Sequence, residues 1–142
     1  MKNLKSIMLG LALLVVCGAA KALSNTIPGK LTKTDVLNIY MNAAAHGKID
    51  GLEKVLADDV QYNIARGEKT ITADKRQMLA AFKAEENIEQ ACKCNTTTLQ
   101  DDDERLVVKV EMKYEGYTRT NVVTIVNKGY GWEITKVNTS VV

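Results

Sequence analysis

Three groups of side chains could carry out chemistry: a histidine, a pair of carboxylates and a pair of thiols. His46, the single histidine of the chain, could act as a general base because an imidazole titrates near neutral pH. It stands beside Gly47, at a predicted helix end, with no Ser or Cys close to it in the sequence. Asp58 and Asp59 adjoin the end of a second predicted helix, where solvated carboxylates are common. We therefore expect all three residues to be structural or solvated, and we predict no catalytic residue among them.

The two thiols, Cys92 and Cys94, are separated by one residue. In an extended strand such residues share a face with Cα atoms about 6.6 Å apart, at the outer edge of disulfide geometry. Two reduced thiols on one face are the favoured interpretation, and a disulfide at a bulge is the first alternative. A metal site is the second alternative, but it would need further ligands. The sequence contains no zinc, nucleotide or phosphate-binding motif, so we predict no metal and no cofactor.

Residues 1–22 have the three-part pattern of a secretory signal peptide. Lys2 and Lys5 precede an apolar run over residues 7–16, and Ala20-Lys21-Ala22 is a small-x-small cleavage signal. The apolar run is too short for a membrane-spanning helix, which needs roughly 20 residues. We expect cleavage after Ala22, a secreted and periplasmic protein, and no membrane association of the mature chain.

A lipid anchor on Cys17 is the alternative to cleavage after Ala22. A lipoprotein signal has a small residue directly before the modified cysteine, whereas this chain has Val16 there, so the anchor is disfavoured. Residues 23–31, which include the sole proline, are predicted to be a linker, and residues 32–142 to form one domain.

The charge balance argues against a nucleic-acid partner. The whole chain has 19 Lys plus Arg and 17 Asp plus Glu. Loss of the three lysines of the signal peptide leaves 16 against 17, a formal net charge of −1. No basic cluster remains, so the electrostatic pattern of a nucleic-acid-binding protein is absent.

Helical spacing and end signals predict three helices in the first half of the chain. Thr32 and Asp35 resemble a capping box that begins a helix over residues 34–46. Asp50 can cap a second, short helix that ends at residues 57–59, and a third helix covers residues 73–84. Between the last two, an alternating apolar pattern predicts a half-buried strand.

The second half of the chain alternates with a period of two, which is typical of antiparallel strands with one packed face. The clearest strand covers residues 106–114, and turn residues at 101–103, 115–116 and 127–131 divide this half into a meander. The order of elements predicts an α+β fold, in which a curved antiparallel sheet wraps around three N-terminal helices on its concave face.

Residues 39–64 and 131–137 carry a family resemblance. The block from Ile39 to Ile64 is similar to the opening of nuclear transport factor 2-like proteins, and the strand Gly131–Val137 resembles the subset named for lumazine binding. The resemblance covers residues 32–142 and implies a cone-shaped fold. It specifies the fold better than the function, since the superfamily includes ketosteroid isomerases, polyketide cyclases and many secreted domains.

The resemblance to ketosteroid isomerases implies that the catalytic groups are incomplete here. Tyr40 falls on the position of their oxyanion-stabilising tyrosine, but the position of their catalytic aspartate is occupied by Ile64, which cannot accept a proton. The strand over residues 121–125, expected to supply a second acid, contains no carboxylate. We therefore favour a protein that is not an enzyme, with a degenerate or relocated catalytic site as the alternative.

A pocket for a small apolar or aromatic ligand is the favoured function. Its predicted lining combines apolar surface with a few hydroxyl or N–H groups, which is the usual make-up of such pockets. The predicted ligand-binding residues are Tyr40, Tyr62, Ile64, Phe82, Met112, Tyr114 and Trp132. The simpler alternative is that these residues only form the core.

A protein-interaction module is the third possibility. Members of the superfamily often form homodimers through the exposed sheet face, so the resemblance implies a homodimer here as well. Alternate residues of one strand combine apolar and polar side chains, as modest interfaces do. This predicted outward stripe consists of Tyr117, Arg119, Asn121, Val123 and Ile125.

Overall fold

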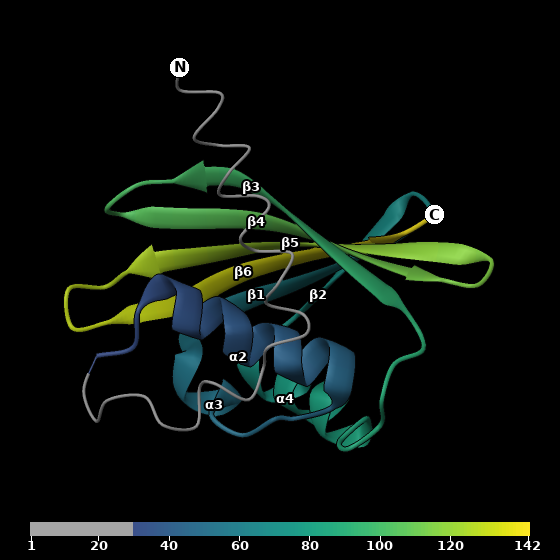
Figure 1. The fold of residues 1–142 in the computed structure, drawn as a ribbon, viewed down its shortest axis with the longest axis horizontal. Helices are drawn as coiled ribbons and strands as arrows, with labels where there is room; N and C mark the ends of the chain where they lie inside the picture. Colours follow the sequence, from purple (N-terminus) through teal and green to yellow (C-terminus); the bar gives the residue numbers. More distant parts are fainter. Residues whose placement is uncertain (1–29) are drawn as a thin grey trace.

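The computed structural model describes residues 30–142, which form one six-stranded sheet with helices on one of its faces (Figure 1). The predicted signal peptide, Cys17 and most of the predicted linker lie outside the described residues. Within residues 30–142, no helix combines the length and the apolar character needed to cross a membrane.

The three predicted helices are present. They are α2 (Lys33–His46), α3 (Leu52–Val55) and α4 (Lys75–Ala84). The prediction that Asp50 caps the second of them is wrong, because its N-cap is Gly51 and no side chain caps it. The capping box of Thr32 and Asp35 is confirmed, and Asp74 with Gln77 forms a second one at the start of α4. These side chains satisfy backbone N–H groups that have no partner within the helix, which is why α2 and α4 begin where they do.

The sheet has the strand order β2-β1-β6-β5-β4-β3. Neighbouring strands are antiparallel except for β1 and β6, which run parallel. The predicted α+β class and meander are therefore confirmed, with one parallel pairing added. The strands are β1 (Leu56–Arg66), β2 (Lys69–Ala73), β3 (Lys93–Asp101), β4 (Arg105–Tyr114), β5 (Tyr117–Asn127) and β6 (Trp132–Val141).

The prediction that the second helix extends to residues 57–59 is wrong. The helix ends at Val55, and β1 begins at Leu56. Asp58 and Asp59 are exposed, as expected, but they lie within β1, where the register with β6 shifts between Leu56 and Gln61. Such a bulge lets polar residues interrupt the alternation of a strand without displacing the inward residues that follow.

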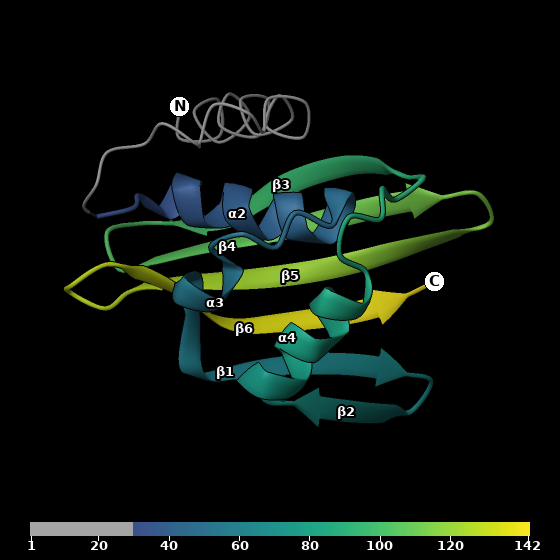
Figure 2. The ribbon, with the colours of Figure 1, turned by 90° about the horizontal axis from the view of Figure 1, so that it is seen from below.

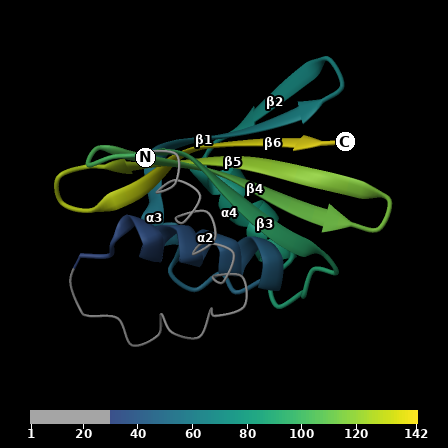
Figure 3. The same ribbon diagram turned by 45° about the horizontal axis from the view of Figure 1, so that its top comes forward.

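The core lies between the concave face of the sheet and the helices. Figures 2 and 3 show α2 and α4 on the same side of the curved sheet. Helix α2 contacts β5 and β6, and α4 contacts β1 and β2. Every second residue of β4 from Leu106 to Met112 is buried, which confirms the predicted alternation. From α2, the fully buried residues Val36 and Leu37 complete this core.

The C-terminal end of α2 is joined to the segment between α4 and β3. Gly47 ends the helix with φ 66°, a left-handed conformation that favours glycine. Its carbonyl accepts a hydrogen bond from the Asn87 N–H at 2.9 Å, and the Ala45 carbonyl accepts one from the Gln90 N–H at 2.8 Å. These contacts hold residues 85–90 against the end of α2.

Candidate functional site

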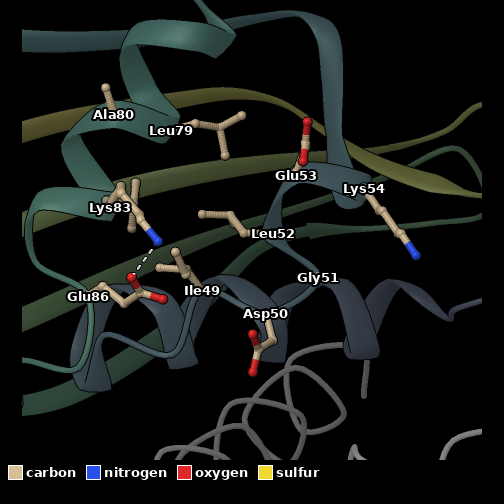
Figure 4. A pocket seen from close by; sticks show the side chains of 11 residues that line it. Ile49, Asp50, Gly51, Leu52, Glu53, Lys54, Leu79, Ala80, Lys83 and Glu86 are labelled. Atoms are coloured by element: carbon tan, nitrogen blue, oxygen red, sulfur yellow. Dashed lines mark ion pairs between the residues drawn. The ribbon is translucent and has the colours of Figure 1, made fainter.

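Two pockets of more than 500 Å³ are candidates for a binding site. The first, of about 590 Å³, is a groove between residues 49–54 and α4, which we call the helix groove (Figure 4). Leu52 and Leu79 form its apolar floor, while the side chains of Asp50 and Lys54 point away from its centre. Lys83 and Glu86 form an ion pair with each other at 2.7 Å. The helix groove therefore contains no group of polar atoms directed at a common point.

The second pocket, of about 540 Å³, lies at the open end of the cone, and we call it the cone pocket. The β1–β2 turn, the β4–β5 turn, the end of β6 and the segment after α4 all contribute to it, so that residues far apart in the chain meet there. It combines apolar, aromatic and charged side chains. The lining residues are Ile64, Ala65, Arg66, Gly67, Glu85, Gln90, Tyr114, Tyr117, Arg119, Thr139 and Val141.

Arg119 is the half-buried charged residue of the cone pocket, whereas Arg66 and Glu85 are exposed. It lines both the cone pocket and a smaller cavity of about 80 Å³ beside Phe82 and Ala44. One of its terminal nitrogens donates a hydrogen bond to the Tyr62 hydroxyl at 2.8 Å, while its Nε is buried and has no hydrogen-bond partner. Burial opposes the charged form, but nearby Tyr62, Tyr40 and Tyr114 outweigh burial and raise the pKa of Arg119. The guanidinium is therefore cationic at physiological pH.

Two tyrosines at the cone pocket form its flat aromatic wall. The rings of Tyr114 and Tyr117 are stacked, with centroids 4.6 Å apart and planes at 9°. The Tyr114 hydroxyl donates a hydrogen bond to Gln90 at 2.7 Å, which ties β4 to the segment after α4. Burial, followed by the charge of Cys92, raises the pKa of Tyr114 to about 12, so this phenol is protonated at neutral pH.

The structure brings together six of the seven predicted ligand-binding residues, but they occupy different depths. Ile64 and Tyr114 line the cone pocket, and Phe82 lines the small cavity beside it. Tyr40 and Tyr62 are buried deeper, with ring centroids 6.0 Å and 6.4 Å from that of Phe82. Met112 is buried and is the cross-strand partner of Arg119. Burial raises the pKa of Tyr40, so its hydroxyl also stays protonated.

The seventh residue, Trp132, is not part of this group. It lies at the first position of β6, opposite Asn127, whereas the cone pocket is formed by the last residues of that strand. Seven residues of a strand separate Trp132 from Thr139, which is roughly 20 Å. The ammonium of Lys33 lies 5.3 Å from the Trp132 ring centroid, so the indole makes a cation–π contact near the start of α2 instead.

The predicted outward stripe on β5 is wrong. Asn121, Val123 and Ile125 are buried against the helices, and Arg119 of the same stripe lines the cone pocket. Sequence reasoning therefore missed Arg119 as an interior residue. A signal was available, because a two-residue turn at Glu115-Gly116 places Tyr114 opposite Tyr117 and Met112 opposite Arg119. Directly paired residues share a face of the sheet, so the residues of β5 that pair with inward-facing residues of β4 also face inward.

Ile64, and Asn121 from the segment 121–125 in which the resemblance to ketosteroid isomerases implies a second acid, both lie in the interior of the fold. Ile64 lies in the wall of the cone pocket. Asn121 is buried, accepts a hydrogen bond from the Thr139 hydroxyl at 2.7 Å, and contacts the sulfur of Met112 at 3.5 Å. Neither side chain is a carboxylate.

The remaining candidate residues form surface contacts. His46 lies at the end of α2, as predicted, with its Nδ1 2.6 Å from a carboxylate oxygen of Glu89. Asp58 pairs with Lys75 at 3.2 Å. Within residues 30–142, no three His, Cys, Asp or Glu side chains are grouped so that they could hold a metal ion.

Cys92 and Cys94 lie side by side near the start of β3. Their sulfurs are 3.9 Å apart, about twice the length of an S–S bond, so the structure has two thiols on one face. Both side chains are half-buried. Burial, followed by the charge and the hydrogen bond of the neighbouring Cys94, raises the pKa of Cys92 to about 11.

We expect Cys92 to be alkylated slowly at neutral pH. Because only the thiolate reacts, a pKa of about 11 leaves far less nucleophile than the ordinary pKa of about 8.5 does. The rate with iodoacetamide, measured at Cys92 by peptide mass spectrometry, should be at least about 10-fold lower than at a free cysteine. It should rise continuously as the pH approaches 11. The same residue in denaturant is the control, and a rate in the folded protein that levels off near the ordinary cysteine pKa would contradict this prediction.

Comparisons with known proteins place the chain in a family. Residues 31–138 match the family described as "Putative lumazine-binding". A protein of unknown function from Silicibacter pomeroyi, described as NTF-2 like, is similar with 13% identity and a TM-score of 0.63 over 77% of this chain and 92% of that one. An NTF2-like protein of unknown function from Shewanella baltica has 7% identity and a TM-score of 0.59 over 77% and 90%.

A third solved structure, an NTF2-like protein of unknown function from Methylobacillus flagellatus, has 18% identity and a TM-score of 0.54 over 77% of this chain and 88% of that one. At such identities these similarities concern the fold alone. A search of curated proteins found no significant match. The family match and the helices on the concave face of a curved six-stranded sheet agree: the chain belongs to the family described as "Putative lumazine-binding" and has the nuclear transport factor 2-like fold.

Proposed function

We propose that this protein binds a small organic molecule in the cone pocket and performs no chemistry on it. The observation that carries this proposal is the convergence of polar groups from separate strands on a pocket of about 540 Å³ that also has apolar and aromatic walls. Ile64 in the wall, at the position that corresponds to the isomerase base, supports a role in binding rather than in proton transfer. The pattern of residues 1–22 further supports a protein that acts after secretion.

Native mass spectrometry of residues 23–142, purified gently from the protein's own host, tests this proposal. We expect an adduct that is released on denaturation, because a pocket of this size can bury most of the surface of a small ligand. The mass of the released molecule identifies it, and lumazine, from which the family takes its name, is one reference compound.

A matched pair of variants locates the adduct. Val141 lines the cone pocket and is 57% exposed, so Val141→Trp fills the pocket without disturbing the core. Ala80 lines the helix groove and is exposed, and Ala80→Trp fills that groove instead. The adduct should disappear in Val141→Trp and persist in Ala80→Trp. The reverse result would place the ligand in the helix groove and contradict the proposal.

A dimer without any adduct would favour an interaction role instead. With the predicted stripe inside the cone, such a dimer would use the opposite face of the sheet, where Thr120, Val122 and Thr124 of β5 are half-exposed. Substituting Val122→Lys would then disrupt the dimer, because it would place charge in the middle of that face.

A further inference from the structure

We propose that the ligand of the cone pocket is an organic anion with a flat, apolar body, and that Arg119 binds its negatively charged oxygens. This inference rests on the proposed binding function and adds the chemical class of the ligand. Its two supports are the uncompensated charge of Arg119 and the composition of the pocket wall.

The guanidinium of Arg119 has no ion-pair partner in the part of the chain that the structure describes. Ion pairs within 4.0 Å form elsewhere, at Lys33, His46, Lys75 and Lys83. A half-buried positive charge is costly unless a negative group or several hydrogen bonds compensate it, and here one terminal nitrogen has a hydrogen bond while Nε has none. A bound anion would supply the missing negative charge.

Tyr62 positions the guanidinium of Arg119. Its hydroxyl oxygen accepts a hydrogen bond from one terminal nitrogen of Arg119 at 2.8 Å. Tyr62 itself is buried and is not among the residues that line the cone pocket. A guanidinium held in this way offers a planar set of N–H donors that suits a carboxylate or a phosphate.

The remaining wall favours anions over cations and provides a surface for a flat ring. Of the charged residues that line the cone pocket, Arg66 and Arg119 are cationic and Glu85 is the single carboxylate. The stacked rings of Tyr114 and Tyr117 and the side chain of Ile64 offer flat and apolar contacts. Glu85 is exposed and lies too far from the guanidinium for an ion pair, yet its charge reaches Arg119 and competes with an incoming anion.

Three small probes separate the charge of the ligand from its shape: benzoate, phenyl phosphate and benzyl alcohol. Binding to the full mature protein, stripped of any host ligand, is followed by NMR titration of the amides that line the cone pocket. We expect at least one anion to bind about 10-fold or more tightly than benzyl alcohol, which corresponds to the usual strength of a hydrogen bond to a charged group. Which anion binds better identifies the acidic group as a carboxylate or a phosphate.

Variants assign the preference to Arg119. Arg119→Met should abolish the difference between the anions and benzyl alcohol, whereas Arg66→Met, which removes the exposed arginine at the rim, should reduce it much less. Glu85→Gln should strengthen anion binding relative to the binding of benzyl alcohol, and this surface variant keeps the test valid if Arg119→Met does not fold.

Four results would overturn the proposal: equal binding of all three probes, no binding of either anion at millimolar concentration, a preference that survives Arg119→Met, or unchanged anion binding in Glu85→Gln. Each of these would leave the binding function intact if the native adduct is present and lost in Val141→Trp. Conversely, absence of any native adduct would count against the binding function itself, whatever the probes show.

Discussion

Replacing Gly47 by alanine is expected to destabilise the fold by about 2–5 kcal/mol, because two costs add. A left-handed backbone conformation costs an L-residue about 1–2 kcal/mol. The new Cβ would also lie 2.6 Å from the Asn87 nitrogen and the Glu85 carbonyl oxygen, and 2.7 Å from the Ile88 nitrogen. These atoms belong to the backbone and cannot rotate away, so overpacking adds about 1–3 kcal/mol. Urea unfolding, with the free energy extrapolated to water, measures the sum.

Gly116→Ala is the matched control for this prediction. Gly116 also has a positive φ, 93°, but nothing lies within 4 Å of the position of its Cβ. Its substitution should therefore cost only the conformational part, about 1–2 kcal/mol. Equal losses in the two variants would show that the segment around Asn87 moves away freely, contrary to the close packing described above.

Replacing Leu37 by alanine is expected to cost about 2–5 kcal/mol. Leu37 is 0% exposed and lies on the face of α2 that packs on the sheet, so truncation leaves a cavity as well as removing apolar contacts. The midpoint of urea unfolding should fall while the dependence on denaturant stays constant, because the same surface is exposed on unfolding.

Leu99→Ala makes the same chemical change at a surface position. Leu99 is 55% exposed on β3, and its truncation should change the free energy of unfolding by no more than about 0.5 kcal/mol. If Leu37→Ala were as mild as this control, α2 would not be anchored on the sheet, and the core described here would be incorrect.

Features set by neighbouring residues could be predicted from the sequence. The start of α2 follows from Thr32 and Asp35, whose hydrogen bonds span three residues. The burial of alternate residues in β4 follows from the two-residue period of a strand, since nearly all of its large apolar side chains are at alternate positions. The end of α3 could not be predicted so well, because the bulge near Asp58 and Asp59 depends on pairing with β6, a distant strand.

The interior position of Arg119 could be predicted only with information from across the sheet. Both sets of alternate residues in β5 contain β-branched and polar side chains, so the composition of the strand alone does not show which face is buried. Pairing of Val123 with Val108, and of Ile125 with Leu106, decides which set is buried. For Trp132, the alternation of β6 predicts the correct face of the sheet but not the place along the strand. The residue lies at the start of β6, at the opposite end of the cone from the pocket.

The parallel pairing of β1 with β6 has a consequence for how the chain reaches its native state. Asn63 and Asn138, whose side chains are hydrogen-bonded at 2.8 Å, are 75 positions apart in the sequence. The β1–β2 hairpin can form early, but it has no place in the sheet until the last strand is available, and contacts of such long range form slowly. A chain that ends before Thr139 would lack two residues of the cone pocket wall, Thr139 and Val141, and part of the strand that pairs with β1.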